Sequence, residues 1–217
     1  MTIKQTIGAV LLGTALAAGS AAAEEVKEVP TQGSVETMVG YKGAVTDLKT
    51  TTDLGAGFGL FTRNFGTLSY TLGQEGAEAS DFGLADLTYN LGPNGDIVLE
   101  GQYSISGGFF SPRVGLQAYG GAGPVSVYGL ATVAPGDVPV ELIGIAGVDA
   151  PLGERAKFHL GVEALIDLGL DGPAFAQQKA RLGIGDDHFE AGAGVDILEV
   201  PGEKLGLNVG AYVKGSW

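Results

Sequence analysis

The chain has 217 residues, with 12 lysines and arginines against 25 aspartates and glutamates, so its formal net charge is −13 at pH 7. Nucleic-acid binding needs a basic surface, and this excess of acid argues against it. The absence of cysteine excludes disulfide bridges, thiolate metal sites and cysteine nucleophiles. Glycine is abundant, at 38 residues, but hydrophobic residues make up 45% of the chain, which is too many for a disordered linker.

The amino terminus has the pattern of a signal peptide. Lys4 provides a positive charge, and residues 7–18 form an apolar run of the length that signal peptides use. Small residues at 21–23 then offer a cleavage site. The alternative is a membrane-anchoring helix, but the run is shorter than the roughly 20 residues that a spanning helix needs. We therefore expect residues 1–23 to be removed on export, which leaves residues 24–32 as a short charged leader in the periplasm.

From residue 33 onward, apolar and polar residues alternate in segments separated by turn sequences. Alternation with a period of two predicts β-strands with two different faces, and turns rich in glycine and proline join them. We predict twelve strands, near residues 33–42, 54–62, 66–73, 82–91, 96–106, 110–119, 125–133, 138–149, 156–168, 177–185, 188–198 and 204–217. The main alternative is ten strands, because the pattern at 54–73 also allows a different pairing.

The last predicted strand has one apolar face and stops on an aromatic residue. Its apolar positions are Leu205, Leu207, Val209, Ala211, Val213 and Trp217. A strand of this length can cross a bilayer at a tilt, which needs roughly 9–11 residues. This ending resembles the last strand of bacterial outer-membrane β-barrels, and the resemblance implies that the barrel-assembly machinery reads Trp217 as part of a signal.

The alternation by itself also fits a soluble antiparallel sandwich. However, the predicted strands are nearer ten residues than the five or six that are usual in soluble sheets, and charged residues recur on the face that would be inside. We therefore predict an all-β fold, a transmembrane antiparallel up-and-down β-barrel over residues 33–217. This barrel would lie in the lipid of the cell outer membrane.

A second resemblance lies near the start of the predicted barrel. Residues 33–36 read Gly-Ser-Val-Glu, and residues 54–59 read Leu-Gly-Ala-Gly-Phe-Gly. These segments resemble the beginning of YfaZ-like small outer-membrane proteins. The resemblance covers only the first hairpin, and it implies a barrel with no settled activity.

Charged residues on the predicted inner face change sign from strand to strand in the carboxy-terminal half. Neighbouring strands lie about 4.8 Å apart, so opposite charges can pair if the register allows. We expect these residues to line one side of the bore, with Lys179 and Arg181 as its central cations; the alternative is a polar interior whose order of signs is accidental. The lumen-lining candidates are Lys157, His159, Glu163, Asp167, Lys179, Arg181, Glu190, Asp196, Lys204 and Lys214.

We expect no catalytic, cofactor or metal site. His159 and His188 are the only histidines, and they lack the paired spacing of metal-binding histidines. A histidine, a carboxylate and a serine would make a hydrolase, but the nucleophile motifs of lipid-modifying outer-membrane enzymes are missing around the candidate serines, Ser104, Ser106, Ser111 and Ser126. The Gly-x-Gly strings, such as the one at 55–59, do not extend to a phosphate-binding loop.

Two acidic segments are candidates for loose calcium binding. Glu75, Glu78 and Asp81 lie in a predicted outward loop, and Asp186-Asp187 lies in a predicted periplasmic turn. An acidic solvated loop is the simpler interpretation of both.

The sequence favours a passive pore for ions or small polar solutes. The predicted outward connections are short, with 43–53 the longest, which argues against a receptor, an adhesin or a protease. A structural barrel with a plugged lumen is the second hypothesis, and a lipid-modifying enzyme is the third. The pattern specifies neither a solute nor an oligomeric state.

Overall fold

The computed structural model describes residues 31–70, 77–135 and 140–217. The predicted signal peptide at 1–23, the first part of the predicted leader and Glu75 lie outside these described residues. The described chain forms twelve strands: β1 (Thr31–Gly40), β2 (Gly43–Gly55), β3 (Phe58–Tyr70), β4 (Ala77–Gly92), β5 (Gly95–Ser104), β6 (Phe109–Ala122), β7 (Val125–Val133), β8 (Val140–Leu152), β9 (Ala156–Gly169), β10 (Gly172–Gly185), β11 (Phe189–Glu199) and β12 (Gly206–Ser216).

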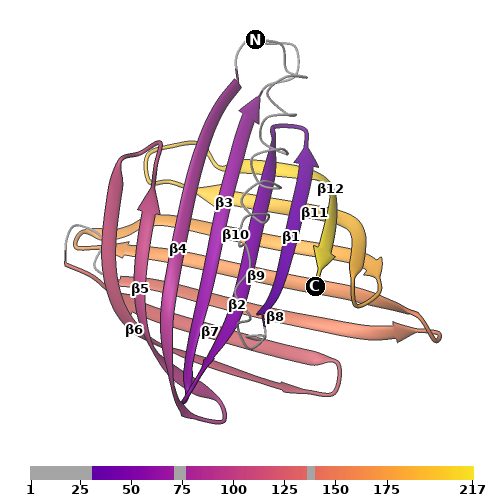
Figure 1. Cartoon of the computed structure of the whole chain (residues 1–217). Coiled ribbons are helices and arrows are strands. Elements are labelled where there is room, and N and C mark those ends of the chain that lie inside the picture. Colours follow the sequence, from indigo (N-terminus) through magenta and orange to yellow (C-terminus); the bar gives the residue numbers. More distant parts are fainter. Residues whose placement is uncertain (1–30, 71–76, 136–139) are drawn as a thin grey trace, which may run out of the picture. The chain divides into compact units, whose positions relative to one another are not determined.

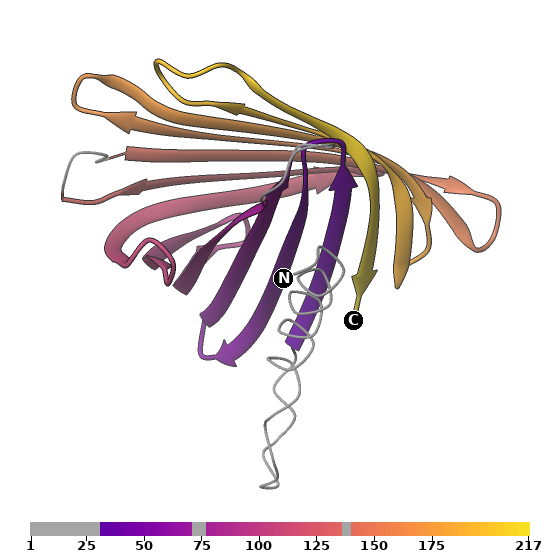
Figure 2. The same ribbon diagram turned by 90° about the horizontal axis from the view of Figure 1, so that it is seen from above.

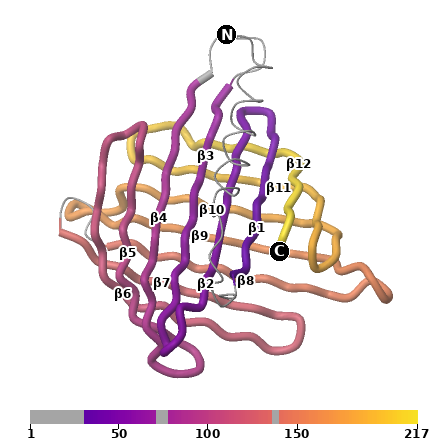
Figure 3. Tube along the Cα trace, in the orientation of Figure 1, coloured from indigo at the N-terminus to yellow at the C-terminus, as the bar shows by residue number. Residues whose placement is uncertain are grey.

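Each strand pairs antiparallel with its neighbours in sequence, and β1 pairs with β12, so the sheet closes into a barrel (Figure 1). The tube in Figure 3 follows this up-and-down path from indigo to yellow. The structure therefore confirms the predicted all-β barrel and its twelve strands, and it excludes the ten-strand alternative. Within the described ranges, no helix is long and apolar enough to span a membrane.

The barrel closes through the two ends of the described chain. Figure 2 shows β1 in indigo beside β12 in yellow, and their register runs from Ser34 opposite Ser216 to Gly40 opposite Gly210. One residue further, the amide of Gly33 donates to the carbonyl of Trp217 and the amide of Trp217 donates back, both at 3.0 Å. A Cβ at Gly33 would lie only 2.4 Å from Cζ2 of Trp217, so the indole ring packs directly on this glycine.

The two broad walls of the barrel run in different directions. In Figure 1, β1 to β4 cross in front of β8 to β11 at a steep angle, as the right-handed twist of neighbouring strands requires. In the closed ring, β3 and β9 are six strands apart in either direction. Long side chains on β3 and β9 therefore face each other across the bore.

Apolar side chains cover the outside of the barrel. Leu116 on β6, Val162 on β9 and Val209 on β12 are each 45–59% exposed. Trp217, at the end of the chain, is 54% exposed, which agrees with its predicted place on the apolar face. Alternate residues of the same strands are buried inside. An apolar exterior around a polar interior is the pattern of a barrel that lies in lipid.

The prediction for the first hairpins was wrong in one respect. Residues 43–53, which were expected to form the longest outward connection, belong to β2, and the turn to β3 falls inside the predicted strand 54–62. Ala56 adopts a φ of 54° between Gly55 and Gly57, which have φ values of 80° and 83°, so this glycine string makes a left-handed turn. Threonines on the outer face of β2 hid its alternation. These threonines are Thr46, Thr50 and Thr52.

Candidate functional site

Ionic side chains from opposite walls meet inside the barrel. Nη2 of Arg63 on β3 lies 2.5 Å from Oδ2 of Asp47 on β2, and 2.9 Å from Oε1 of Glu163 on β9. Lys49 on β2 and Lys179 on β10 complete the group, with each ammonium 3.5–3.8 Å from both carboxylates. Because β2 and β3 lie on the opposite side of the ring from β9 and β10, the contacts of Glu163 with Arg63 and Lys49, and of Lys179 with Asp47, cross the bore. We call these five residues the central ion cluster.

The central ion cluster is almost dry. The side chains of Asp47, Arg63, Glu163 and Lys179 are 6–11% exposed, and only Lys49 reaches 33%. The ammonium of Lys179 also lies 4.0 Å from the ring centroid of Phe65, a cation–π contact. A buried ion pair contributes little net stability compared with apolar packing, but removal of one partner costs about 3–5 kcal/mol. The cluster therefore holds the two walls at a fixed distance.

Arg181 makes a second set of ion pairs beside the central ion cluster. Its Nε donates to Oε1 of Glu36 on β1 at 2.8 Å, and its Nη1 donates to Oδ1 of Asp196 on β11 at 2.7 Å. The guanidinium lies close over Gly194, where a Cβ would be 3.0 Å from Nη1 and 2.8 Å from Sδ of Met38. A glycine at position 194 thus makes room for the arginine.

A third group of charges consists mostly of carboxyl groups. Asp86 on β4 lies opposite Glu100 on β5, and Glu141 on β8 lies opposite Asp167 on β9. Within each pair two carboxyl groups stand side by side on neighbouring strands, and two carboxylates in this position repel each other. Nε2 of Gln102 donates to Oε1 of Glu100 and to Oε2 of Glu141, both at 2.9 Å, and so joins the two pairs.

Arg113 on β6 is the cation of this third group. Its Nε donates to the hydroxyl of Thr132 at 2.7 Å and lies 3.4 Å from Oε1 of Glu100. We call Asp86, Glu100, Arg113, Glu141 and Asp167 the acid cluster. Asp86, Glu100 and Glu141 are only 1–3% exposed. One buried oxygen on each of the four carboxyl groups lacks a hydrogen-bond partner: Oδ1 of Asp86, Oε2 of Glu100, Oε1 of Glu141 and Oδ1 of Asp167.

Two pockets with mixed polar and apolar linings open on either side of the central ion cluster. The larger has a volume of about 690 Å³ and is lined by residues that include Val45, Thr67, Gln177 and Asn208. The smaller, of about 510 Å³, lies at the end of the barrel that carries the chain's carboxy terminus. Its lining includes Lys49, Thr51, Phe61, Lys214 and Ser216. Along β2 the order is Val45, Asp47 and Lys49, so the cluster separates the two pockets.

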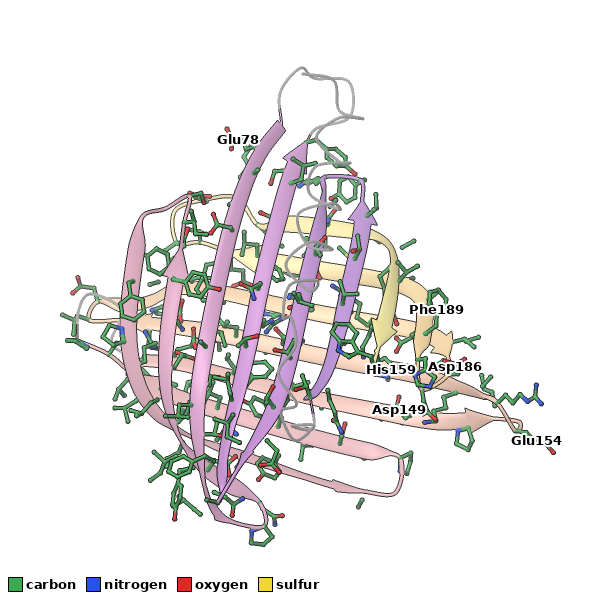
Figure 4. The ribbon with its side chains drawn as sticks, in the orientation of Figure 1. Glu78, Asp149, Glu154, His159, Asp186 and Phe189 are labelled. Carbon is green, nitrogen blue, oxygen red and sulfur yellow. The ribbon has the colours of Figure 1, made fainter. Side chains whose placement is uncertain are left out.

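A third pocket lies at the end of the barrel near the connection between β10 and β11. Figure 4 shows Asp149, His159, Asp186 and Phe189 gathered there. The pocket has a volume of about 170 Å³, and its lining includes these residues and Lys157. Nδ1 of His159 lies 2.6 Å from Oδ1 of Asp149, in a hydrogen bond between β9 and β8.

The acidic segments considered for calcium have other partners. Oxygens of Asp81 accept hydrogen bonds from the amides of residues 105 and 106, both at 2.7 Å. Asp186 accepts from the amides of His188 and Phe189, and these bonds hold the pKa of Asp186 below its ordinary value. Among the described residues, no group of three or more histidine, aspartate or glutamate side chains has an arrangement that could hold a metal ion.

The predicted lumen residues occupy several places in the structure. Glu163 and Lys179 belong to the central ion cluster, and Asp167 belongs to the acid cluster. Arg181 and Asp196 pair with each other. Four more line the pocket near the β10–β11 connection: Lys157, His159, Glu190 and Lys214. Lys204 is exposed in the connection that precedes β12, so its expected place in the bore is corrected.

The predicted order of signs agrees with the register of the strands. Lys179 lies opposite Glu163 on one side and opposite Asp196 on the other, and Glu190 lies opposite Lys214. Sequence reasoning missed the residues that these side chains meet across the bore. Asp47 and Lys49 lie in the predicted connection 43–53, and Arg63 lies between the predicted strands 54–62 and 66–73. The signal that could have found them is the inward spacing of two between Asp47, Lys49 and Thr51.

Comparison with known proteins supports the fold. No family model and no curated protein sequence matches the chain, so the resemblance to YfaZ-like proteins stays a prediction. The KdgM porin is similar in structure, with a TM-score of 0.52 and 13% identity over 86% of this chain and 99% of that one. The KdgM porin in complex with disordered oligogalacturonate is similar over the same shares, with a TM-score of 0.50 and 12% identity. The chain therefore has the fold of outer-membrane β-barrels.

Proposed function

We propose that this chain is an outer-membrane porin that passes ions or small polar solutes, with the central ion cluster as the narrowest part of its bore. The observation that carries the proposal is the pair of pockets inside a closed barrel, separated by that cluster. The apolar exterior supports a place in lipid. The porin fold of the similar structures is consistent with this role, and the proposal includes no enzymatic activity and no cofactor.

A structural barrel with a plugged lumen is the second candidate. The near-complete burial of Arg63, Asp47 and Lys179 favours it, because the ion pairs join opposite walls. The two candidates differ in whether the cluster leaves a continuous aqueous path beside Lys49, the one member with a third of its side chain exposed.

Conductance of the refolded protein in a planar bilayer separates the two candidates. Stable open steps support the porin, and a silent bilayer with inserted protein supports the plug. Arg63→Ala should raise the step size, because it removes the side chain that crosses the bore. Arg155→Ala, which removes an exposed arginine in the turn between β8 and β9, is the matched control and should leave the step size unchanged. Equal steps from all three proteins would contradict the role of the cluster as the narrowest part.

A further inference from the structure

The acid cluster holds four of the six buried side-chain atoms that lack a hydrogen-bond partner among the described residues, the other two being Nη2 of Arg181 and Oδ2 of Asp196. Four carboxyl groups share one guanidinium, and each carboxyl group keeps one such oxygen. A buried acceptor left without a partner costs about 1–3 kcal/mol. In the central ion cluster, by contrast, no buried side-chain oxygen or nitrogen of a described residue lacks a partner.

These four oxygens need a positive charge or a hydrogen-bond donor. Asp86 lies opposite Glu100, and Glu141 lies opposite Asp167, so two carboxylates in either pair repel each other unless a proton or a cation lies between them. A small cation can replace a proton between two carboxylates, since it also neutralises their repulsion. The guanidinium of Arg113 sits beside Glu100 and supplies one charge for the four groups.

The arrangement also limits which cation fits. Calcium takes six to eight oxygen ligands around one point, and no group of three acidic side chains in the described residues converges in that way. The carboxyl groups lie instead in two pairs, on β4 and β5 and on β8 and β9, with Gln102 between them. Each pair offers two carboxyl groups side by side on its own wall of the bore, which suits a monovalent ion better than calcium.

We propose that the acid cluster is the selectivity site of the bore, where Asp86, Glu100, Glu141 and Asp167 bind monovalent inorganic cations in transit and exclude anions. This inference rests on the proposed porin function, and it names the class of solute. The cluster draws its selectivity from an excess of carboxylates over cations, which the central ion cluster lacks.

The test is the zero-current potential of the refolded protein in a planar bilayer with a KCl gradient. The wild-type protein should show a zero-current potential whose sign indicates that K⁺ permeates more readily than Cl⁻. The double variant Asp86→Asn/Glu141→Gln should shift the potential toward the anion side. Both substitutions keep side-chain shape, and each amide supplies a hydrogen-bond donor to its carboxyl pair. The single variant Glu141→Gln should show a smaller shift of the same sign.

Glu199→Gln is the matched control, because it removes the same charge from an exposed position at the end of β11. Its potential should equal that of the wild type. Circular dichroism confirms that each variant has folded. Open steps without K⁺ preference, or a double variant that behaves as the wild type, would overturn the selectivity site and leave the porin function standing. A silent bilayer with inserted, folded wild-type protein would overturn both.

Discussion

The central ion cluster and the acid cluster are both buried inside one barrel, yet they are built in opposite ways. The central ion cluster has three cations around two carboxylates, and its contacts run both between neighbouring strands and between opposite walls. The acid cluster has four carboxyl groups and one guanidinium, and like groups face each other on neighbouring strands. The first arrangement resists the removal of any member. The second contains repulsion that a folded protein has no structural reason to keep, which is why we assign it to solute selection.

The largest effect is expected for Arg63→Gln. The variant leaves Asp47 and Glu163 buried without their main partner, and it should lower the free energy of unfolding by about 3–5 kcal/mol. Denaturant unfolding of the protein in lipid vesicles measures this. Arg155→Gln, at an exposed position, is the control and should unfold as the wild type does. If both variants unfold at the same midpoint, the cluster does not brace the walls.

A pair of identical substitutions compares the two clusters directly. Glu163→Gln should lower the free energy of unfolding by about 3 kcal/mol, because it leaves three cations around one carboxylate. Glu141→Gln should leave the free energy unchanged or raise it by up to about 1 kcal/mol, because it relieves repulsion between paired carboxyl groups and keeps the bond from Gln102. The two unfolding curves should separate. An equal loss in both variants would show that the clusters have the same structural role.

Removal of Trp217 tests barrel closure without touching either cluster. Deletion removes two backbone hydrogen bonds to Gly33 and should lower the free energy of unfolding by about 1–3 kcal/mol. Trp217→Ala keeps those bonds and should be milder in vitro. Both variants should reach the outer membrane of cells in smaller amounts, if the assembly machinery reads the aromatic ring. Normal amounts of the Trp217→Ala protein would contradict that role.

The smallest effect is expected at the rim of the barrel. Lys157 is paired with Asp187, but both side chains are largely exposed. An exposed ion pair is weak because water screens it, so Lys157→Gln should not move the unfolding midpoint. A clear shift of that midpoint would mean that an exposed ion pair at the rim stabilises the barrel as the buried pairs do, which would contradict this prediction.

The sequence predicted the barrel, its number of strands and the apolar outer face, because a period of two is a local signal. It also predicted that the inward charges alternate in sign from strand to strand, and the register that places Lys179 opposite Glu163 agrees with this order. It did not predict the contacts of Arg63 with Glu163, since that pair depends on which strands face each other across a closed ring. The threonine-rich outer face of β2 removed the contrast in polarity that would have marked Asp47 and Lys49 as inward.

The contact between Arg63 and Glu163 joins residues that are 100 positions apart in the chain. It forms only when the two halves of the sheet have curled toward each other, so no early hairpin contains it. The ion pairs that cross the bore therefore form late, when the barrel closes, whereas the pairs of Asp47 with Arg63 and of Glu163 with Lys179 lie within single hairpins. Folding of this barrel should thus be cooperative at its last step, because an open sheet would keep the pairs within neighbouring strands but lose the contacts that Glu163 makes with Arg63 and Lys49.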